Sequence, residues 1–185
     1  MTATTTRTFS EMTLDVYETN KANGWFDDQR AFGDDMALTH SEVSEMFEAF
    51  RDYGFDDVTK ALCEKAGTEH TCKPEGFGSE AADVLVRVLD TCFRYEVILP
   101  WSSLEEVVSH PLFNADDTPG THIYNLHLLL SRVAIFDMSF SATVSYLVAW
   151  CRHLDPHLDR DLQAEFDRKL AYNKTRGHKH GGKRI

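Results

Sequence analysis

The chain has 185 residues, enough to bury a sizeable core, and its 42% hydrophobic and 26% charged residues are typical of a soluble globular protein. No apolar run reaches the roughly 18 to 20 residues of a membrane span, and the N-terminus lacks the apolar segment of a signal peptide, so we expect a cytoplasmic protein without membrane partners. The formal net charge of −11 disfavours nucleic acid as a partner, because phosphate contacts need a positive surface.

The charge is unevenly distributed along the chain. From Arg168 to Ile185 there are seven Lys or Arg residues and no Asp or Glu. The preceding 167 residues hold the other 12 basic residues and all 30 acidic ones. Residues 168–185 thus form a basic tail, which suits a polyanion: a nucleic-acid strand or a nucleoside triphosphate.

Apolar residues recur at helical spacing through most of the chain. Val43, Met46, Phe47 and Phe50 show the i, i+3, i+4, i+7 pattern of an amphipathic helix, and no strong period-2 stretch or hairpin signal is present. In chain order, the predicted helices cover residues 10–21, 34–53, 58–65, 79–99, a short segment with capping-box spacing from Ser102 to Glu105, 121–153 and 155–174.

Polar residues and helix breakers set these predicted boundaries. Asp34 and Ser79 are the expected N-caps of two long helices, and Asp155, followed by a proline, is that of the last helix. Gly54 is expected to end the helix that reaches Tyr53. Together the patterns predict a single all-α domain over residues 1–185, a helical bundle with four or five main helices.

The four cysteines are scattered and form no C-x-x-C pair. Cys92 and Cys151 fall on apolar helical positions, where cysteine is a small buried hydrophobe. Cys63 and Cys72, with His70, offer a zinc-site alternative, although their spacing matches no standard pattern. Reduced, structural thiols are the expectation for all four.

Two predicted helices carry pairs of carboxylates at i, i+3. Glu42 and Glu45 lie in "HSEVSE", and Glu80 and Asp83 lie in "GSEAAD". A three-residue step places both members of a pair on one face of a helix, so antiparallel packing would bring four carboxylates together. Such a cluster needs protons or cations, and oxygen-only ligands favour Mg²⁺ or Mn²⁺.

A solvated face is the alternative interpretation of the second pair. Glu80, Asp83, Arg87 and Asp90 form a stripe roughly opposite the apolar face of their predicted helix. Stripes of this kind usually face water, and the spacing alone does not exclude it.

Three stretches in a fixed order resemble a known family. "HSEVSEMFEAFR", "GFGSEAADVLVRVLD" and "KLAYNKTRGHKHGGKRI" are similar to the MazG-type members of the all-α nucleotide pyrophosphohydrolases. That family combines Glu-x-x-Glu, a spacer and Glu-x-x-Asp, and many members end in "KxxYNxxR…HGGK". The resemblance covers about residues 21–53, 78–94 and 168–185.

The resemblance implies a Mg²⁺-dependent nucleoside triphosphate pyrophosphohydrolase, with Mn²⁺ as an alternative metal. Such enzymes convert an NTP or dNTP to the monophosphate and pyrophosphate by attack of a metal-activated water. Glu42, Glu45, Glu80 and Asp83 would be the metal ligands and catalytic residues. Family members act as homodimers or tetramers, and we favour a homodimer.

The resemblance also assigns substrate-binding residues. The phosphate-binding candidates in the basic tail are Lys169, Tyr172, Asn173, Arg176, His180 and Lys183. The candidates for binding the base are Lys21, Asn23, Trp25 and Phe26, although an aromatic residue in such a loop is commonly a hydrophobic anchor. A solvated helix end is the alternative for the tail, because cations favour that end of the helix dipole.

Several further polar residues stay open or are expected to be structural. His40 either donates a hydrogen bond to a metal ligand or is exposed, and Glu48 either assists a metal or faces water. His122, His127 and Asp137, on the long apolar helix, are expected to be satisfied polar groups of the core or an interface.

One departure from the family concerns the spacer. The 34 residues between Glu45 and Glu80 exceed the usual length, which we interpret as an insertion at 55–77 beside the substrate entrance. The preferred base is therefore left open. The alternatives are a catalytically silent nucleotide-binding or regulatory module, an alarmone nucleotide hydrolase, or a helical interaction protein whose tail binds nucleic acid.

Overall fold

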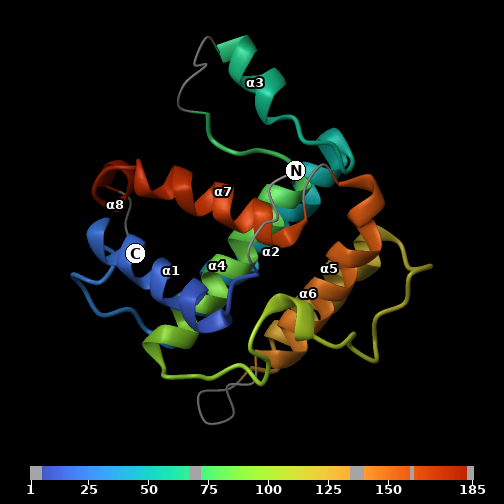
Figure 1. Cartoon of the computed structure of the whole chain (residues 1–185), viewed down its shortest axis with the longest axis horizontal. Helices are drawn as coiled ribbons and strands as arrows, with labels where there is room; N and C mark the ends of the chain where they lie inside the picture. The colour runs from blue at the N-terminus through green and yellow to red at the C-terminus, as the bar shows by residue number, and fades with distance from the viewer. Residues whose placement is uncertain (1–5, 67–71, 134–139, 159–160, 183–185) are drawn as a thin grey trace.

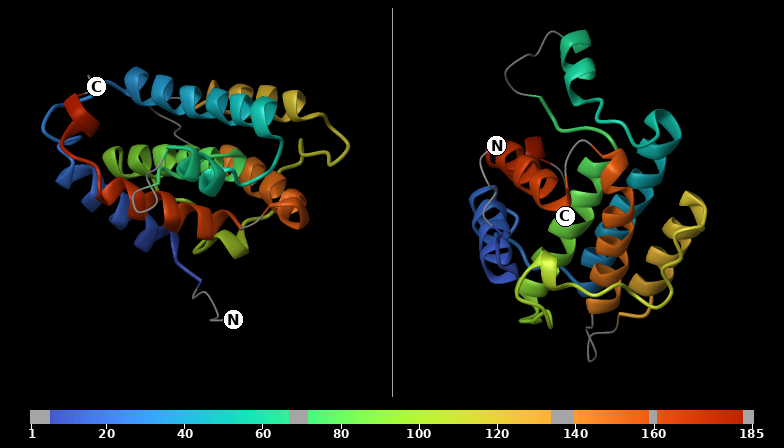
Figure 2. Two further views of the ribbon diagram at one scale, coloured as in Figure 1. Left: turned by 90° about the horizontal axis from the view of Figure 1, so that it is seen from above. Right: turned by 45° about the vertical axis from the view of Figure 1, so that its right-hand side comes forward.

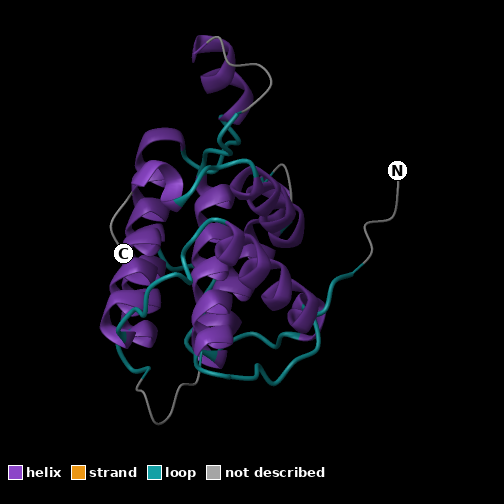
Figure 3. Cartoon of the chain, turned by 90° about the vertical axis from the view of Figure 1, so that its left-hand side faces the viewer, coloured by secondary structure: helices purple, strands orange, loops and turns teal. Residues whose placement is uncertain are grey.

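The computed structural model describes residues 6–66, 72–133, 140–158 and 161–182, which form eight α-helices and two short 3-10 turns. The elements are α1 (Phe9–Ala22), α2 (Phe32–Tyr53), α3 (Thr59–Ala66), α4 (Phe77–Arg94), η1 (Leu104–Glu106), α5 (Pro119–Leu130), α6 (Ser141–Leu154), η2 (Asp155–His157), α7 (Leu162–Lys174) and α8 (Lys179–Gly182). Figure 3 shows helices and loops throughout this described part, with no strand. The all-α prediction is confirmed, with more helices than the four or five expected.

Helix α4 lies at the centre of the bundle. It packs against α2 on one side and against α1 and α7 on the other, and it also contacts α6 (Figures 1 and 2). Helix α5 packs on α2 and α6. The helices share one apolar core, so the three helices around α4 fix the side chains that project from it.

The apolar stripe of α4 explains its central position. Val84, Leu85 and Leu89 are fully buried, and burial of a leucine side chain contributes roughly 1.5–3 kcal/mol to stability. The polar side is also largely removed from water, because Glu80 and Asp90 are only 4% and 1% exposed and Asp83 and Arg87 are partly buried. The solvated-stripe interpretation of α4 is therefore wrong.

The starts of α2 and α4 differ from the predicted caps. Ala31 is the N-cap of α2, and Asp34 lies one turn inside, where its carboxylate accepts from the Ala31 N–H at 3.3 Å. Gly76 is the N-cap of α4, and the Ser79 hydroxyl donates to the Pro74 carbonyl at 2.9 Å. The end of α2 before Gly54 is confirmed, whereas α4 ends at Arg94 rather than at residue 99.

The single long helix predicted over 121–153 is wrong. Helices α5 and α6 take its place and pack against each other. A straight helix of that length would extend about 50 Å, longer than the 22 residues of α2, whereas two helices that fold back bury both apolar faces in one core. Asp137 lies outside the described residues.

The last long helix begins later than predicted and ends as predicted. Asp155 opens the 3-10 turn η2, while the carboxylate of Asp161 caps α7 by accepting from the Ala164 N–H at 2.8 Å. Helix α7 ends at Lys174. The segment after Ser102 forms the 3-10 turn η1 instead of an α-helix.

The insertion at 55–77 carries a disulfide bond. Cys63 in α3 is bonded to Cys72, so neither thiol is reduced and neither is available to zinc; His70 lies outside the described residues. Cys92 and Cys151 are buried and unbonded, as predicted. Figure 1 shows α3 projecting away from the bundle. None of the helices among the described residues combines the length and apolar character of a membrane span.

Candidate active site

Helices α2 and α4 bring three of the four predicted carboxylates together. Oxygen atoms of Glu42, Glu80 and Asp83, which we call the acid cluster, all lie within 4.8 Å of one another. The i, i+3 step of α4 places its two acids on one face, and Glu42 on α2 faces them. Glu45 is exposed and does not belong to this cluster, but its charge helps to raise the pKa of Glu42 and of Glu80.

Glu80 is the most deeply buried member of the cluster. Its side-chain atom Oε2 is enclosed and has no hydrogen-bond partner among the described residues. Burial raises the pKa of Glu80 to about 7, and the charge of Asp83 adds to this effect, while Lys169 and Lys73 oppose it. A proton or a metal cation at the enclosed Oε2 would therefore stabilise this carboxylate.

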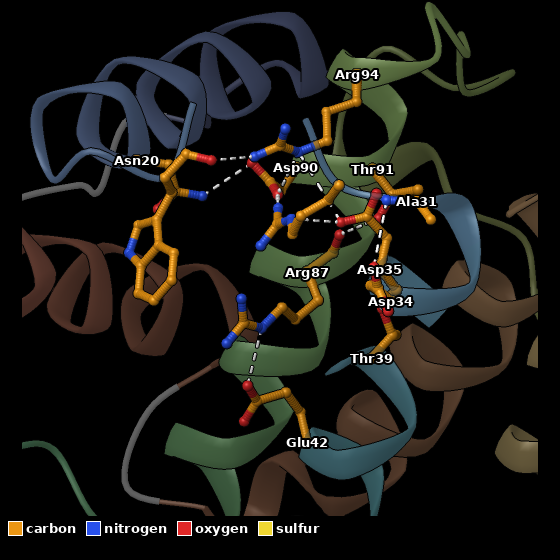
Figure 4. Close-up of polar contacts among 12 residues, drawn as sticks. Asn20, Ala31, Asp34, Asp35, Thr39, Glu42, Arg87, Asp90, Thr91 and Arg94 are labelled. Atoms are coloured by element: carbon orange, nitrogen blue, oxygen red, sulfur yellow. Dashed lines mark hydrogen bonds and ion pairs between the residues drawn. The ribbon is translucent and has the colours of Figure 1, made fainter. Parts of the chain in front are cut away.

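Glu42 experiences a similar environment. Burial raises its pKa, and Arg87 opposes the shift because its Nε donates to Glu42 Oε1 at 2.9 Å. Figure 4 shows this pair bridging α2 and α4. The guanidinium therefore compensates one carboxylate of the cluster from the side of α4.

A buried lysine from α7 compensates the other two carboxylates. Lys169 is only 2% exposed, and its Nζ lies 2.7 Å from Asp83 Oδ2 and 3.6 Å from Glu80 Oε1. The ammonium also donates to Ser79 Oγ at 2.9 Å. Lys73, just before α4, is partly exposed and lies 3.9 Å from Glu80 Oε1.

The donor set fits a small divalent cation. Ligand oxygens about 2.1 Å from Mg²⁺ are at most about 4.2 Å apart across the ion, so the observed limit of 4.8 Å requires a small inward movement of the side chains. The partnerless oxygen of Glu80 points to the same conclusion, because a buried carboxylate oxygen is costly when nothing binds it. Glu42, Glu80 and Asp83 are the residues that would hold the ion.

The predicted phosphate-binding residues of α7 lie at different depths. Lys169 is inside the acid cluster, and Asn173 is buried, with an Oδ1 that has no hydrogen-bond partner among the described residues. Tyr172 and Arg176 are half-buried, and the guanidinium lies 5.8 Å from the centre of the tyrosine ring. The structure thus places Lys169 alone of this group next to the acids.

The end of the basic tail packs on the loop at 23–28 instead of on the acid cluster. The Lys179 N–H donates to the Asn23 carbonyl at 2.7 Å, and the Lys179 ammonium bonds to Asp28. His178 Nε2 lies 3.0 Å from Asp27 Oδ2. Figure 1 shows α8 beside the C-terminal end of α1. Lys183 lies outside the described residues.

Of the aromatic residues proposed to bind the base, Trp25 is buried and Phe26 is partly buried against its neighbours. Trp25 is 9% exposed, and its indole Nε1 donates to His180 Nε2 at 3.4 Å. The Phe26 ring meets Tyr17 edge-on at 5.0 Å and carries the Arg94 guanidinium at 3.7 Å. Both rings therefore serve as anchors of the loop in this structure.

The two polar candidates for the base have equally local contacts. The Asn23 side-chain amide donates to the Asn173 carbonyl at 3.0 Å, which ties the loop to α7. Lys21 is exposed, and its ammonium lies 5.3 Å from the centre of the Tyr17 ring.

Of the remaining polar candidates, the histidines form contacts with other side chains and Glu48 is exposed to solvent. His40 stacks on His127, with 2.8 Å between their Nδ1 atoms, so α2 and α5 share this contact. His122 Nδ1 lies 2.8 Å from the Tyr146 hydroxyl in the core. The expectation of satisfied polar groups is confirmed for both histidines of α5, and Glu48 is exposed.

A buried ion network around Asp90 was not predicted from the sequence. Asp90 on α4 accepts from Asn20 of α1 at 2.9 Å and from Arg94 at 3.1 Å, and it also pairs with Arg30 (Figure 4). Arg30 Nε in turn lies 2.9 Å from Asp35 Oδ1. Arginine and aspartate at these positions give no periodic signal, because the partners come from separate segments of the chain.

Gly24 was missed as well. Its φ of +79° favours glycine, and a Cβ there would lie 2.3 Å from His178 Nε2. The Asn23-Gly24 pair is a sequence signal for a turn, but it does not predict that His178 of the tail lies against this turn.

A cavity of about 1120 Å³ lies at the opposite end of α4 from the acid cluster. Its lining includes Phe26, Phe93, Arg94, Tyr95 and Trp101. The carboxylates do not line it, so the cavity and the acid cluster are separate features.

Comparisons of the chain with protein-family models, with curated proteins and with solved structures found no match. The features that bear on function are therefore the ordered sequence motifs, the acid cluster and the basic tail.

Proposed function

We propose that this protein is a Mg²⁺-dependent nucleoside triphosphate pyrophosphohydrolase that converts an NTP or dNTP to the monophosphate and pyrophosphate. The single observation that carries the proposal is the buried Glu80 carboxylate, whose Oε2 has no hydrogen-bond partner among the described residues and which lies beside Glu42 and Asp83. Three carboxylates in one enclosed place favour a cation of high charge.

The metal would supply charge compensation for the phosphates and would lower the pKa of a bound water. Glu42, Glu80 and Asp83 would hold it through oxygen atoms. Glu45 is the most exposed of the four predicted carboxylates and remains close enough to influence the pKa of Glu42 and Glu80. Its position suits a group that accepts the proton of the attacking water and passes it to solvent.

The proposed reaction is a hydrolysis without an external co-reactant. The oxygen of water forms a bond to phosphorus, and the bridging P–O bond between the α and β phosphates breaks. Its electron pair leaves with pyrophosphate, and the water proton goes to Glu45 and then to solvent. The charge that develops on the leaving pyrophosphate needs cationic partners that are already in place.

Helix α7 and the residues just after it supply such partners. Lys169 lies on α7 and Arg176 follows two residues after the helix ends at Lys174, while the neutral amide of Asn173 lies one helical turn after Lys169 on the same face. Arg176 is half-buried and offers a planar donor group that matches phosphate. The pairs of the tail with Asp27 and Asp28 are exposed to water, which screens them, so phosphate can displace them at small cost.

The test is nucleotide consumption with a panel of NTPs, dNTPs and alarmone nucleotides, in Mg²⁺ and in EDTA. We expect turnover only with the metal, and a loss of at least about 100-fold in kcat in Glu80→Gln, because a buried charge at the reacting phosphates is removed. Glu48→Gln is the matched control on α2, since Glu48 is exposed and lies outside the acid cluster.

Two results would contradict the proposal. Turnover that persists in Glu80→Gln would remove the acid cluster from the chemistry. Metal-dependent nucleotide binding without turnover of any member of the panel would instead indicate a catalytically silent binding module.

A further inference from the structure

The Lys169 ammonium occupies a place that suits a metal cation. It bonds to Asp83 Oδ2 at 2.7 Å and lies 3.6 Å from Glu80 Oε1, and these are two of the three carboxylates that would bind the ion. Its other contacts are neutral oxygens, Ser79 Oγ at 2.9 Å and the Pro74 carbonyl at 3.4 Å. The acid cluster is thus already compensated by an internal cation.

We propose that Lys169 competes with the divalent cation for Glu80 and Asp83, and that the phosphates of a nucleotide relieve this competition by attracting the ammonium. Metal and nucleotide then bind cooperatively, each strengthening the binding of the other. The inference rests on the proposed function, because it assumes that phosphates bind next to the acid cluster.

The competition follows from the contacts of Lys169. A divalent ion held by Asp83 and Glu80 would lie close to an ammonium that bonds to the same two residues, and two cations in an enclosed site repel each other strongly. The lysine is 2% exposed, so water does little to screen this repulsion. A flexible four-carbon stem allows the ammonium to move, whereas its Cα is fixed by α7.

The other internal cations are less suited to this role. Arg87 Nε bonds to Glu42, and its planar guanidinium approaches the cluster from α4, the helix that carries two of the acids. Lys73 is 43% exposed in its side chain and lies 3.9 Å from Glu80, so it can turn to solvent with little loss. Lys169 is buried and belongs to the helix that also carries Asn173, and Arg176 follows two residues after that helix ends.

Thermodynamic linkage turns the competition into cooperativity. If a phosphate removes Lys169 from the two carboxylates, it raises the metal affinity by some factor, and the metal must raise the nucleotide affinity by the same factor. The coupling does not require hydrolysis. It is therefore measurable with an analogue in which a methylene group replaces the oxygen between the α and β phosphates.

The experiment is a Mn²⁺ titration of the full chain, followed by the electron paramagnetic resonance signal of free Mn²⁺. Without nucleotide, we expect Lys169→Met to bind Mn²⁺ about tenfold more tightly than the wild type, because the competing charge is gone. Lys174→Met is the matched control: it removes one positive charge from the same helix, where the 53%-exposed Lys174 pairs with Asp15 and not with the acid cluster. Its Mn²⁺ affinity should stay within about twofold of the wild type.

A second titration tests the coupling in the wild type first and then in the variant. With the methylene analogue present, the wild type should bind Mn²⁺ about tenfold more tightly, and Lys169→Met should lose most of that increase. Absence of coupling in the wild type would overturn the inference even if Lys169→Met failed to fold.

The outcomes separate this inference from the proposed function. Normal wild-type turnover, combined with an unchanged or weaker Mn²⁺ affinity in a folded Lys169→Met, would overturn the competition and leave the enzyme activity standing. No Mn²⁺ binding to the wild type, with or without the analogue, would contradict both.

Discussion

At the residue scale, the site depends on a carboxylate that the fold holds away from water. Glu80 lies on the central helix, with Asp83 and Lys169 as its nearest charged partners in the cluster. Burial favours its neutral form, whereas a metal would favour the charged form. Proton and metal are therefore alternative occupants of one carboxylate.

This balance predicts how the metal-free protein responds to pH. Because the pKa of Glu80 rises from the ordinary 4.5 to about 7 on folding, its contribution to stability is complete below pH 4.5 and is lost as the pH rises through about 7. In EDTA, the free energy of unfolding of the wild type should therefore fall, relative to Glu80→Gln, by up to about 3 kcal/mol between pH 4.5 and 7.5. Urea unfolding at both pH values measures it, and parallel profiles of the two proteins would contradict the account.

Gly24 sets the contact between the tail and the loop at 23–28. Alanine at this position would meet His178 Nε2 at 2.3 Å and would be strained at a φ of +79°. We predict that Gly24→Ala displaces the tail and speeds hydrogen exchange of the Lys179 N–H, which donates to the Asn23 carbonyl at 2.7 Å.

Gly33→Ala is the control for this exchange measurement. Alanine there would meet no described atom within 4 Å beyond its own turn of helix, so exchange of the Lys179 amide should not change. Equal exchange rates in Gly24→Ala and the wild type would show that the tail does not depend on this glycine.

At the element scale, α4 organises the molecule because both of its sides are buried. Its apolar stripe enters the core, and its polar side carries the acid cluster at one end and Asp90 at the other. Periodicity predicts the apolar stripe but not the burial of the opposite side, since that depends on α1, α2 and α7 closing around it.

The network around Asp90 should be essential to this closure. Asp90→Ala would remove a buried carboxylate that pairs with Arg30 and Arg94. The side chains of these two arginines are only 6% and 11% exposed, so water cannot replace the lost partner. Loss of one partner from a buried ion pair typically costs about 3–5 kcal/mol, and we predict a loss of this size in urea unfolding. Glu48→Ala, at an exposed position of α2, should change stability by less than about 0.5 kcal/mol; a similarly small effect of Asp90→Ala would show that the network is dispensable.

Local sequence signals predicted the presence of helices better than the connections between them. The end of α2 before Gly54 and the end of α7 at Lys174 follow from breakers and periodicity. The separation of α5 from α6 does not, because both segments are apolar and the break depends on packing around the core. The Cys63–Cys72 disulfide bond likewise could not be predicted from the spacing of the cysteines alone.

The candidate site divides in the same way. The i, i+3 pairs identified Glu42, Glu80 and Asp83, because helical geometry alone places such pairs on one face. The contact of Lys169 with the acids and the docking of Lys179 on Asp28 could not be predicted, since each joins segments far apart in the sequence.

At the scale of the whole molecule, the uneven charge has a structural outcome. The chain carries a net charge of −11, and several residues of its basic tail pair with acidic side chains. Lys169 compensates the acid cluster, while His178 and Lys179 pair with the exposed Asp27 and Asp28. In the proposed function, a polyanionic substrate replaces the protein's own carboxylates as the partner of these cations.

The most direct test of this account is ³¹P nuclear magnetic resonance of a nucleoside triphosphate incubated with the full chain and Mg²⁺. We expect equal amounts of nucleoside monophosphate and pyrophosphate in Mg²⁺, and no formation of either product in EDTA. Orthophosphate and a nucleoside diphosphate would contradict this account, because they would mean that the β–γ bond breaks instead.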